Sequence, residues 1–288
     1  MNLQINDLFK LKYSNRFQNQ IYTKYNISFP EEDFHLIKGN VFCVADGVTR
    51  DLYKGEVRPY PKTKEEAEYI AKNYPNPSGA YEASKIISNN FVKYVSEKAP
   101  TKQNVFKSIK KANKDVWKIN ENRNIDYVGE DLYCCEAVGG VIDNNYLYCF
   151  SIGDCYIKIY DKNINEIFST ENDHLYMEMF EEEYLKEGEY NWLNPRYRLL
   201  IRGALRNNSI VTHNGKCVGY GALTGEDSAM KFVKIYKVNL KNAKYICAYS
   251  DGCMEYFETK EKVTTTINCP EIIKNGGSER TLVIYEKK

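Results

Sequence analysis

Two apolar runs, far apart in the chain, end on the same Asp-Gly dipeptide. The first is Val41–Gly47 (VFCVADG) and the second is Tyr245–Gly252 (YICAYSDG). Short apolar runs rich in β-forming residues and closed by a turn signal predict buried strands. If the two strands are neighbours, Asp46 and Asp251 converge at one end of a sheet. Converging carboxylates are how a protein builds a site for a hard divalent cation.

A single Asp-Gly ending is weak evidence for such a site, because many strands end in this dipeptide. Asp hydrogen-bonds locally and Gly accepts a positive φ. Two copies on comparable strands, with Gly153-Asp154 after a third strand, favour the metal interpretation. The unhindered carbonyl of Gly47 also suits an ion beside Asp46.

The composition argues against several classes of protein. The 288 residues allow one large domain or two small ones, and a net charge of +1 argues against a general nucleic-acid surface. No stretch approaches the ~18 consecutive apolar residues of a membrane span, and the N-terminus lacks the pattern of a secretory signal. We therefore expect a monomeric, cytoplasmic protein with reduced cysteines and with neither nucleic-acid nor membrane partners.

The order of the expected elements predicts one α+β domain over residues 1–288, with helices covering sheets. Apolar residues recur at three- and four-residue steps over 80–94 and 105–119, which predicts two helices. Residues 52–78 hold four prolines and are expected to form a surface insertion with a short helix at 63–72. The expected strands are 136–142 and 146–152, as a hairpin around Asp143-Asn144-Asn145, then 156–160, 232–240 paired with 245–249, and 281–285, with a further hairpin at Asn214-Gly215.

This order of elements resembles the PP2C-type metal-dependent protein phosphatases, the PPM family. The resemblance covers about residues 30–288. Each motif is short, but their order along the chain is specific. The motifs are Glu32-Asp33, Val44-Ala45-Asp46-Gly47, Ile152-Gly153-Asp154-Cys155, Asp173-His174, Tyr249-Ser250-Asp251-Gly252 and Ser278–Ile284.

The resemblance implies a four-layer α-β-β-α sandwich, in which helices flank two antiparallel sheets, with two Mg²⁺ or Mn²⁺ ions at one end. Asp46 would bridge both ions, the Gly47 carbonyl would bind one, and Asp251 would bind the other. Glu32 and Asp33 would hold metal-bound waters. Two ions about 3.5–4 Å apart clamp a phosphoryl group and acidify a water. The implied activity is hydrolysis of phosphoserine or phosphothreonine in a phosphoprotein substrate.

The sequence departs from the family at two places. Where the family's last motif has an Asp, this chain has Ser278, so Glu279 is the candidate third carboxylate. The family's phosphate-binding Arg falls on Ser28. Arg50 is the local candidate for phosphate oxygens, because an Arg fork matches them, with an ordinary surface role as its alternative. Arg206 is a weaker candidate.

Asp154 and His174 are expected to be structural, the first as a turn residue. The segment 175–230 diverges from the family and leaves the substrate open. Two alternatives to a protein phosphatase therefore remain. One is a degenerate relative that binds a partner without hydrolysis, and the other is a phosphohydrolase for small molecules whose site is narrowed by the insertion at 52–78.

Overall fold

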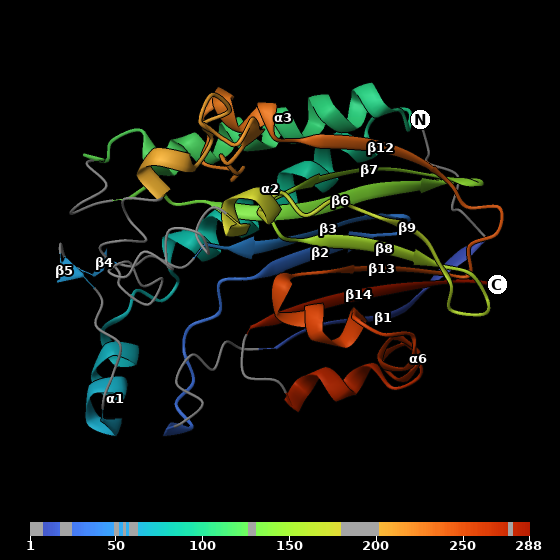
Figure 1. Ribbon diagram of the computed structural model, residues 1–288, viewed down its shortest axis with the longest axis horizontal. Coiled ribbons are helices and arrows are strands. Elements are labelled where there is room, and N and C mark those ends of the chain that lie inside the picture. The colour runs from blue at the N-terminus through green and yellow to red at the C-terminus, as the bar shows by residue number, and fades with distance from the viewer. Residues whose placement is uncertain are drawn as a thin grey trace.

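Two five-stranded antiparallel sheets stack face to face in the computed structural model, and helices cover both outer faces (Figure 1). This is the α-β-β-α sandwich that the sequence analysis expected, so the fold class is confirmed. The structure describes residues 8–17, 25–48, 52–53, 56–57, 63–125, 131–179, 202–275 and 279–288, without the side chains of 52–53 and 56–57.

The first sheet runs in the order β12-β7-β6-β3-β2. Its centre is the expected hairpin, in which Asp143 pairs with Tyr146 across Asn144-Asn145. Asn144 has a φ of 49°, a left-handed conformation that Asn tolerates better than most residues. The strands are β2 Phe34–Lys38, β3 Val41–Gly47, β6 Cys135–Asp143, β7 Tyr146–Ile152 and β12 Lys234–Asn239.

The second sheet runs in the order β1-β14-β13-β8-β9. The expected pairing of 232–240 with 245–249 is wrong, because β12 pairs with β7 of the first sheet and β13 pairs with β14 and β8. Strand periodicity gives the face of a side chain but not the partner of a strand. The strands are β1 Phe9–Phe17, which the sequence analysis left unassigned, β8 Tyr156–Tyr160, β9 Glu166–Ser169, β13 Tyr245–Tyr249 and β14 Arg280–Lys287.

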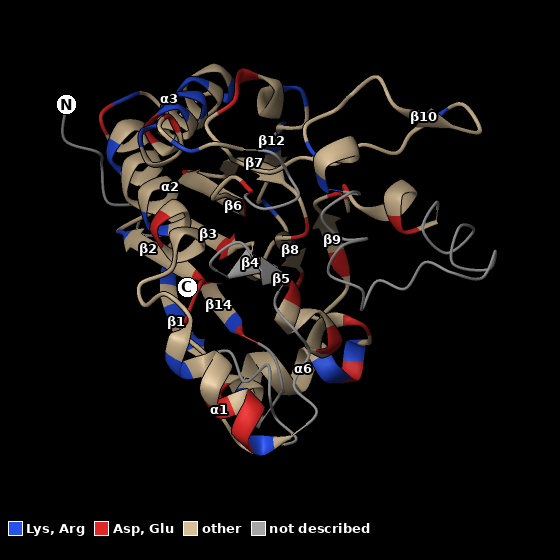
Figure 2. Cartoon of the chain, turned by 90° about the vertical axis from the view of Figure 1, so that its left-hand side faces the viewer, with Lys and Arg blue, Asp and Glu red and all other residues tan. Residues whose placement is uncertain are grey.

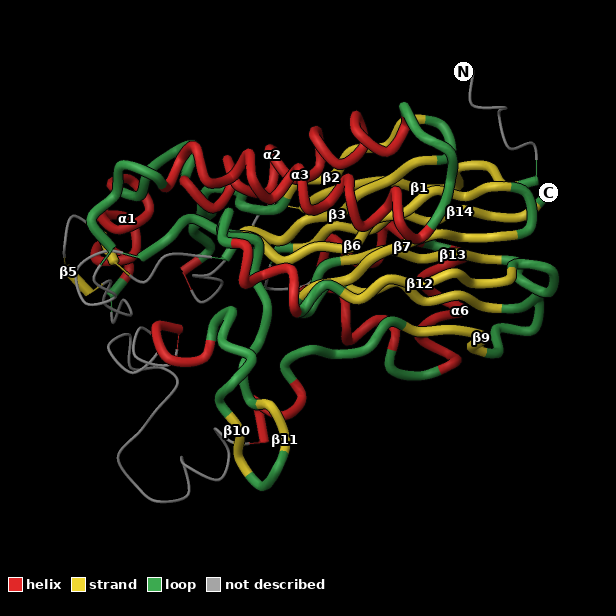
Figure 3. Tube along the Cα trace, turned by 90° about the horizontal axis from the view of Figure 1, so that it is seen from above, coloured by secondary structure: helices red, strands yellow, loops and turns green. Residues whose placement is uncertain are grey.

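The two long helices were both expected, and each begins at a side-chain cap. Ser78 accepts a hydrogen bond from the Tyr81 amide, and Thr101 accepts one from the Asn104 amide. Both helices lie across the first sheet (Figure 3). The helices are α1 Lys64–Asn73, α2 Gly79–Ser96, α3 Lys102–Asn120 and α6 Lys260–Asn268, with 3₁₀ turns η2 Asp227–Lys231, η3 Asp251–Phe257 and η4 Pro270–Asn275.

Three layers of buried side chains hold the four layers of backbone together. Helices α2 and α3 pack on the first sheet, the two sheets pack on each other, and α6 with η3 packs on the second sheet. The alternation along β3 connects this packing to function. Cys43 faces the helices, whereas Phe42 and Val44 face the other sheet. Asp46 continues the Phe42–Val44 side, so it points into the space between the sheets.

The expected insertion at 52–78 is only partly a surface element. Its helix is confirmed as α1, and a short pair, β4 Leu52–Tyr53 and β5 Glu56–Val57, precedes it. Tyr74 and Ser78 are buried, at 5% and 2% exposure, so the end of the segment packs into the body of the protein.

A second, smaller hairpin stands out from the body of the protein. Strands β10 Thr212–His213 and β11 Lys216–Cys217 pair across the expected Asn214-Gly215 turn (Figure 3). Among the helices that the structure describes, none has the length and apolar character needed to cross a membrane.

Candidate metal centre

Asp46 and Asp251 meet at one end of the sandwich. Asp46 lies near the end of β3 in the first sheet, and Asp251 directly follows β13 in the second. The two strands are therefore not neighbours in one sheet but belong to the two different sheets of the sandwich. Figure 2 looks onto this end of the molecule, where acidic positions lie near the ends of β3 and β8. Burial, followed by the charges of Asp33 and Asp251, raises the pKa of Asp46 well above its ordinary value.

Asp33 joins these two residues from the segment before β2. Its Oδ2 accepts hydrogen bonds from Ser250 Oγ at 2.8 Å and Thr281 Oγ1 at 2.9 Å. Its Oδ1 is buried without a hydrogen-bond partner in the described part of the chain. Burial raises the pKa of Asp33 to about 7, although the two hydroxyl donors act in the opposite direction. A buried carboxylate oxygen without a donor fits a place beside a cation or its water shell.

Gly47 allows the Glu32-Asp33 segment to pack against the end of β3. A Cβ at position 47 would lie 2.5 Å from the Glu32 carbonyl oxygen. Glu32 is itself held in place, because its Oε1 accepts from Tyr74 Oη at 2.8 Å and from Ser78 Oγ at 2.6 Å. Sequence reasoning missed Tyr74 and Ser78, since the prolines around them indicated a surface loop.

The carboxylate of Glu279, the candidate third ligand, is directed at backbone amides. Both of its carboxylate oxygens accept from the backbone amide of Glu32, at 2.8 and 2.9 Å, and one also accepts from the Asp33 amide at 2.9 Å. The carboxylate therefore faces backbone N–H groups and fixes the segment that carries Asp33. Burial, together with the charge of Asp33, raises its pKa to about 10. We leave Glu279 out of the ligand set that we propose.

The structure describes one of the two arginines that were expected to bind phosphate. Arg206 is buried and forms an ion pair with Asp131, with Nη2 to Oδ1 at 2.5 Å and Nη1 to Oδ2 at 3.2 Å. Because this pair uses the guanidinium fork, the idea that Arg206 binds phosphate is not supported. Arg50 lies outside the described residues, as does Ser278.

A second group of polar side chains lies next to Asp46. Glu136 is directly opposite Asp46 in the β3–β6 register, so the two side chains share one face. Glu136 Oε2 accepts from the Asp154 amide at 2.6 Å. His174 Nε2 lies 3.1 Å from Glu136 Oε1, and its Nδ1 lies 3.8 Å from Asp154 Oδ2. Asp154 is the turn residue that was expected, but Glu136 was missed because only the register places it here.

The charges in this group shift the pKa of its histidine and of Asp154. Burial disfavours a charged imidazole, but the nearby Glu136 and Asp154 outweigh it and raise the pKa of His174 to about 10. Burial and the charge of Glu136 raise the pKa of Asp154 as well. The ligand atoms of Asp46, Asp154 and Cys155 also lie within 4.8 Å of one another, so the second group adjoins the first.

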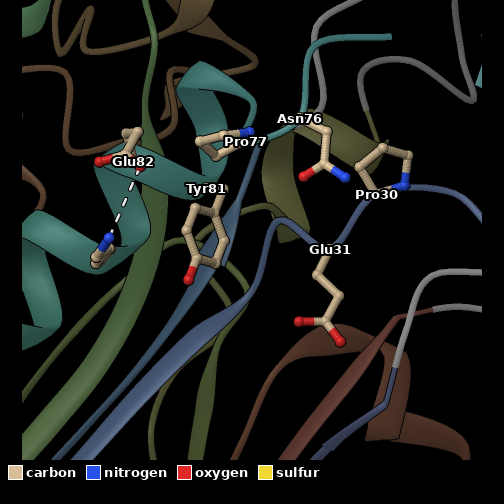
Figure 4. A pocket seen from close by; sticks show the side chains of 7 residues that line it. Pro30, Glu31, Asn76, Pro77, Tyr81 and Glu82 are labelled. Carbon is tan, nitrogen blue, oxygen red and sulfur yellow. Dashed lines mark ion pairs between the residues drawn. The ribbon is translucent and has the colours of Figure 1, made fainter. Parts of the chain in front are cut away.

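A surface pocket of about 410 Å³ lies on the chain segments next to Glu32 and Ser78 (Figure 4). The ring of Tyr81 and the carboxylate of Glu31 frame it, with Pro30 and Pro77 nearby. Glu82 pairs with Lys85 on its rim at 3.9 Å. Glu31 pairs with Arg16, which also donates to the Asp33 carbonyl at 2.7 Å. Both carboxylates that line the pocket are therefore paired with a basic side chain.

Comparison with known proteins gives matches only at the level of structure. No profile of a protein family and no curated protein sequence matches the chain. The catalytic domain of the serine/threonine phosphatase PstP, in complex with two manganese ions, matches with a TM-score of 0.54 and 12% identity, over 97% of this chain and 98% of that chain. MsPP, a PPM Ser-Thr phosphatase from Mycobacterium smegmatis, matches with a TM-score of 0.54 and 11% identity, over 98% and 100%.

Stp1, a serine/threonine phosphatase from Staphylococcus aureus, matches with a TM-score of 0.56 and 10% identity, over 100% of this chain and 98% of that chain. The chain has the PPM phosphatase fold. The resemblance that the motif order indicated is therefore confirmed for the fold. At this level of identity, the PPM fold accounts for the arrangement of the layers, whereas the roles of Asp46, Gly47 and Asp251 stay predictions.

Proposed function

We propose that the chain is a metal-dependent phosphatase that hydrolyses phosphoserine or phosphothreonine in proteins. The observation that carries the proposal is the meeting of Asp33, Asp46 and Asp251 at one end of the sandwich, where Asp33 Oδ1 is buried without a donor. Structural similarity to PPM phosphatases, one of them in complex with two manganese ions, supports the same conclusion.

Asp46, the carbonyl of Gly47 and Asp251 would hold two ions, Mg²⁺ or Mn²⁺, since oxygen ligands suit hard cations. Such ions, when bound, neutralise phosphoryl oxygens and acidify water. Asp46 is well placed for a shared role because it points between the two sheets. Asp251 belongs to the opposite sheet, so it would bind from the other side.

The remaining residues would position the reactants. Asp33 Oδ1 is available to accept a hydrogen bond from a water in the site, while its Oδ2 is fixed by Ser250 and Thr281. Glu279 would act through the backbone of Glu32 and Asp33, which it holds by three hydrogen bonds. Arg50 remains our candidate for contacting the phosphate of the substrate.

One observation favours a second function. The Glu279 carboxylate is directed at backbone amides, so the described part of the last strand supplies no carboxylate to the ions. A chain with fewer ligands binds ions more weakly, and a PPM-fold protein without bound ions would bind a partner but would not hydrolyse phosphate.

The deciding experiment measures phosphate release from p-nitrophenyl phosphate, a phosphoserine peptide and a nucleotide, each with Mn²⁺. We expect the peptide to be hydrolysed. The substitutions Asp46→Ala and Asp251→Ala should each lower turnover at least about 1,000-fold, which corresponds to about 4 kcal/mol of barrier. Asp227→Ala, at a side chain that is 72% exposed, is the matched control and should leave turnover unchanged.

Equal activity in the Asp46 and Asp251 variants would overturn the proposed ligand set. Calorimetric titration with Mn²⁺ separates the second function from the first. A chain that binds no Mn²⁺ and releases no phosphate would contradict the first function and leave the second, which capture of a partner would then have to test. Faster hydrolysis of the nucleotide than of the peptide would instead identify a small-molecule phosphohydrolase.

A further inference from the structure

We propose that Tyr74 is a positioning residue for the candidate metal centre, through which helix α1 of the insertion fixes the Glu32 carboxylate. Tyr74 Oη donates a hydrogen bond to Glu32 Oε1 at 2.8 Å. The PPM resemblance implies that Glu32 holds metal-bound waters, and the proposal therefore rests on the proposed metal-dependent function. The insertion at 52–78 would then support ion binding, which is a different role from narrowing the site.

The sequence of the insertion helix places Tyr74 at its C-terminal end. Thr63 caps the first turn by accepting a hydrogen bond from the Glu66 amide. The Tyr74 amide donates to the Ile70 carbonyl at 2.9 Å, which closes the last turn. Tyr74 itself has an extended backbone, with φ −68° and ψ 139°, so the chain leaves the helix there. Ala67, Ile70 and Tyr74 recur at three- and four-residue steps and share one face.

That face of α1 packs on the chain segment that leads to Glu32. Ala67, Ile70 and Tyr74 form a buried cluster with Phe29, and the rings of Phe29 and Tyr74 lie 4.3 Å apart. In the described part of the chain, this cluster contains no residue of the two five-stranded sheets. Helix α1 accordingly stands away from the stacked sheets (Figure 1). Its docking is therefore transmitted to the residues just before Glu32.

Two hydroxyl groups, from the end of α1 and from the cap of α2, bind the same oxygen of the Glu32 carboxylate. Ser78 Oγ donates to Glu32 Oε1 at 2.6 Å, beside the Tyr74 hydroxyl. Ser78 Oγ also accepts from the Tyr81 amide at 3.1 Å, so the same side chain caps α2. Glu32, Tyr74 and Ser78 are all buried. The carboxylate therefore cannot turn without breaking a buried, charge-assisted hydrogen bond.

Glu32 lies against the end of β3, where the Gly47 carbonyl is a proposed ligand. A Cβ at Gly47 would lie 2.9 Å from Glu32 Cβ and 3.0 Å from the carbonyl carbon of Ala80. The end of β3 is thus packed against both the Glu32 segment and the first turn of α2. Residues that orient the surroundings of a metal in this way typically change its affinity about 10- to 100-fold when they are mutated. We therefore expect the Tyr74 hydroxyl to strengthen ion binding.

Calorimetric titration of the full chain with Mn²⁺, in the absence of substrate, tests the proposal. Tyr74→Phe removes only the hydroxyl group, and we expect the Kd for Mn²⁺ to rise about 10-fold. Tyr69→Phe is the matched control, because it makes the same change on the same helix at a side chain that is 67% exposed, and it should leave the Kd unchanged. In a Glu32→Ala background, Tyr74→Phe should have no further effect, since the acceptor is gone.

A second variant tests the link to α1 itself. Ile70→Ala removes apolar contacts of the α1 cluster and changes none of the proposed ligands, so it should raise the Kd by letting α1 open locally. An unchanged Kd in Tyr74→Phe or in Ile70→Ala would overturn the proposal, as would an additive effect of Tyr74→Phe in the Glu32→Ala background. None of these titrations needs turnover, so a wild type that binds Mn²⁺ but releases no phosphate contradicts the proposed function alone. A wild type that binds no Mn²⁺ would overturn both.

Discussion

Two clusters of buried charge in this protein are built in opposite ways. Asp131 and Arg206 are 2% and 6% exposed and neutralise each other. Burial acts to raise the pKa of Asp131, but Arg206 outweighs it, and the pKa is lowered. Asp33 is 1% exposed, and the hydroxyl groups of Ser250 and Thr281 donate hydrogen bonds to its Oδ2. Its pKa is raised to about 7.

The difference indicates which cluster is structural. The charge of the buried Asp131 carboxylate is neutralised by the buried Arg206. This ion pair holds residues 202–206 against the segment before β6. A buried carboxylate beside other carboxylates lacks a neutralising partner, and the like charges repel one another where little water screens them. Such a cluster is stable at neutral pH only with protons or with cations from solution. The comparison therefore favours a cation-binding role for Asp33, Asp46 and Asp251.

The largest expected effect is at the neutralised pair. Asp131→Asn should lower the free energy of unfolding by about 3 kcal/mol, because it removes the carboxylate that neutralises the buried Arg206 guanidinium. Urea denaturation in EDTA measures this. Asp46→Asn is the matched variant and should raise the free energy of unfolding in EDTA, since it removes one of the repelling charges. Equal destabilisation by the two variants would contradict the comparison.

The next effect is the pH dependence of the metal-free protein. Because the pKa of Asp33 is higher in the folded state than the usual 3.8, the folded chain binds more protons than the unfolded chain between these values. Stability is therefore lost as the pH rises through about 7, by an amount on the order of 2 kcal/mol between pH 5 and pH 8. Chemical denaturation in EDTA at both pH values measures the loss.

The same measurement in Asp33→Asn shows how much of the loss depends on this residue, both through its own proton and through the effect of its charge on the pKa of Asp46 and Glu279. Comparing the wild type with Asp33→Asn also cancels the contribution of His35, which is the same in both proteins. Burial lowers the pKa of His35 to about 4, so this residue destabilises the fold in acid. Saturating Mn²⁺ should remove the loss in the wild type, because cations replace the protons. A wild type whose stability rises between pH 5 and pH 8 in EDTA, relative to Asp33→Asn, would refute this account.

The smallest effect is at Glu279. Glu279→Gln replaces one acceptor oxygen by an amide NH₂ that faces a backbone N–H, so we expect a loss of about 1 kcal/mol of unfolding free energy. The number of Mn²⁺ ions bound should not change. Glu286→Gln, at a partly exposed pair with Lys12 and Lys244, is the control and should stay within about 0.5 kcal/mol. One bound ion fewer in Glu279→Gln would restore Glu279 as a ligand, as the sequence first suggested.

Sequence patterns predicted the elements whose signals are local. The α2 and α3 stripes, the β6–β7 hairpin around Asn144-Asn145, and the strand endings at Asp46 and Asp251 all depend on residues close together in the chain. The position of β1 and the pairing of β12 were not predicted. Both depend on which distant strand offers a free edge, and the alternation of apolar residues contains no such information.

The candidate site was likewise predicted only in part. The sequence alone determined that carboxylates follow buried strands, in the order of the PPM motifs. Strand periodicity and turn residues depend on positions that are close together in the chain. Only the tertiary structure decided that Asp46 and Asp251 meet across two stacked sheets, that Glu136 lies beside Asp46, and that Glu279 faces backbone amides. These contacts join residues up to 247 positions apart. They follow from sheet stacking and strand register, which the packing of the whole core determines.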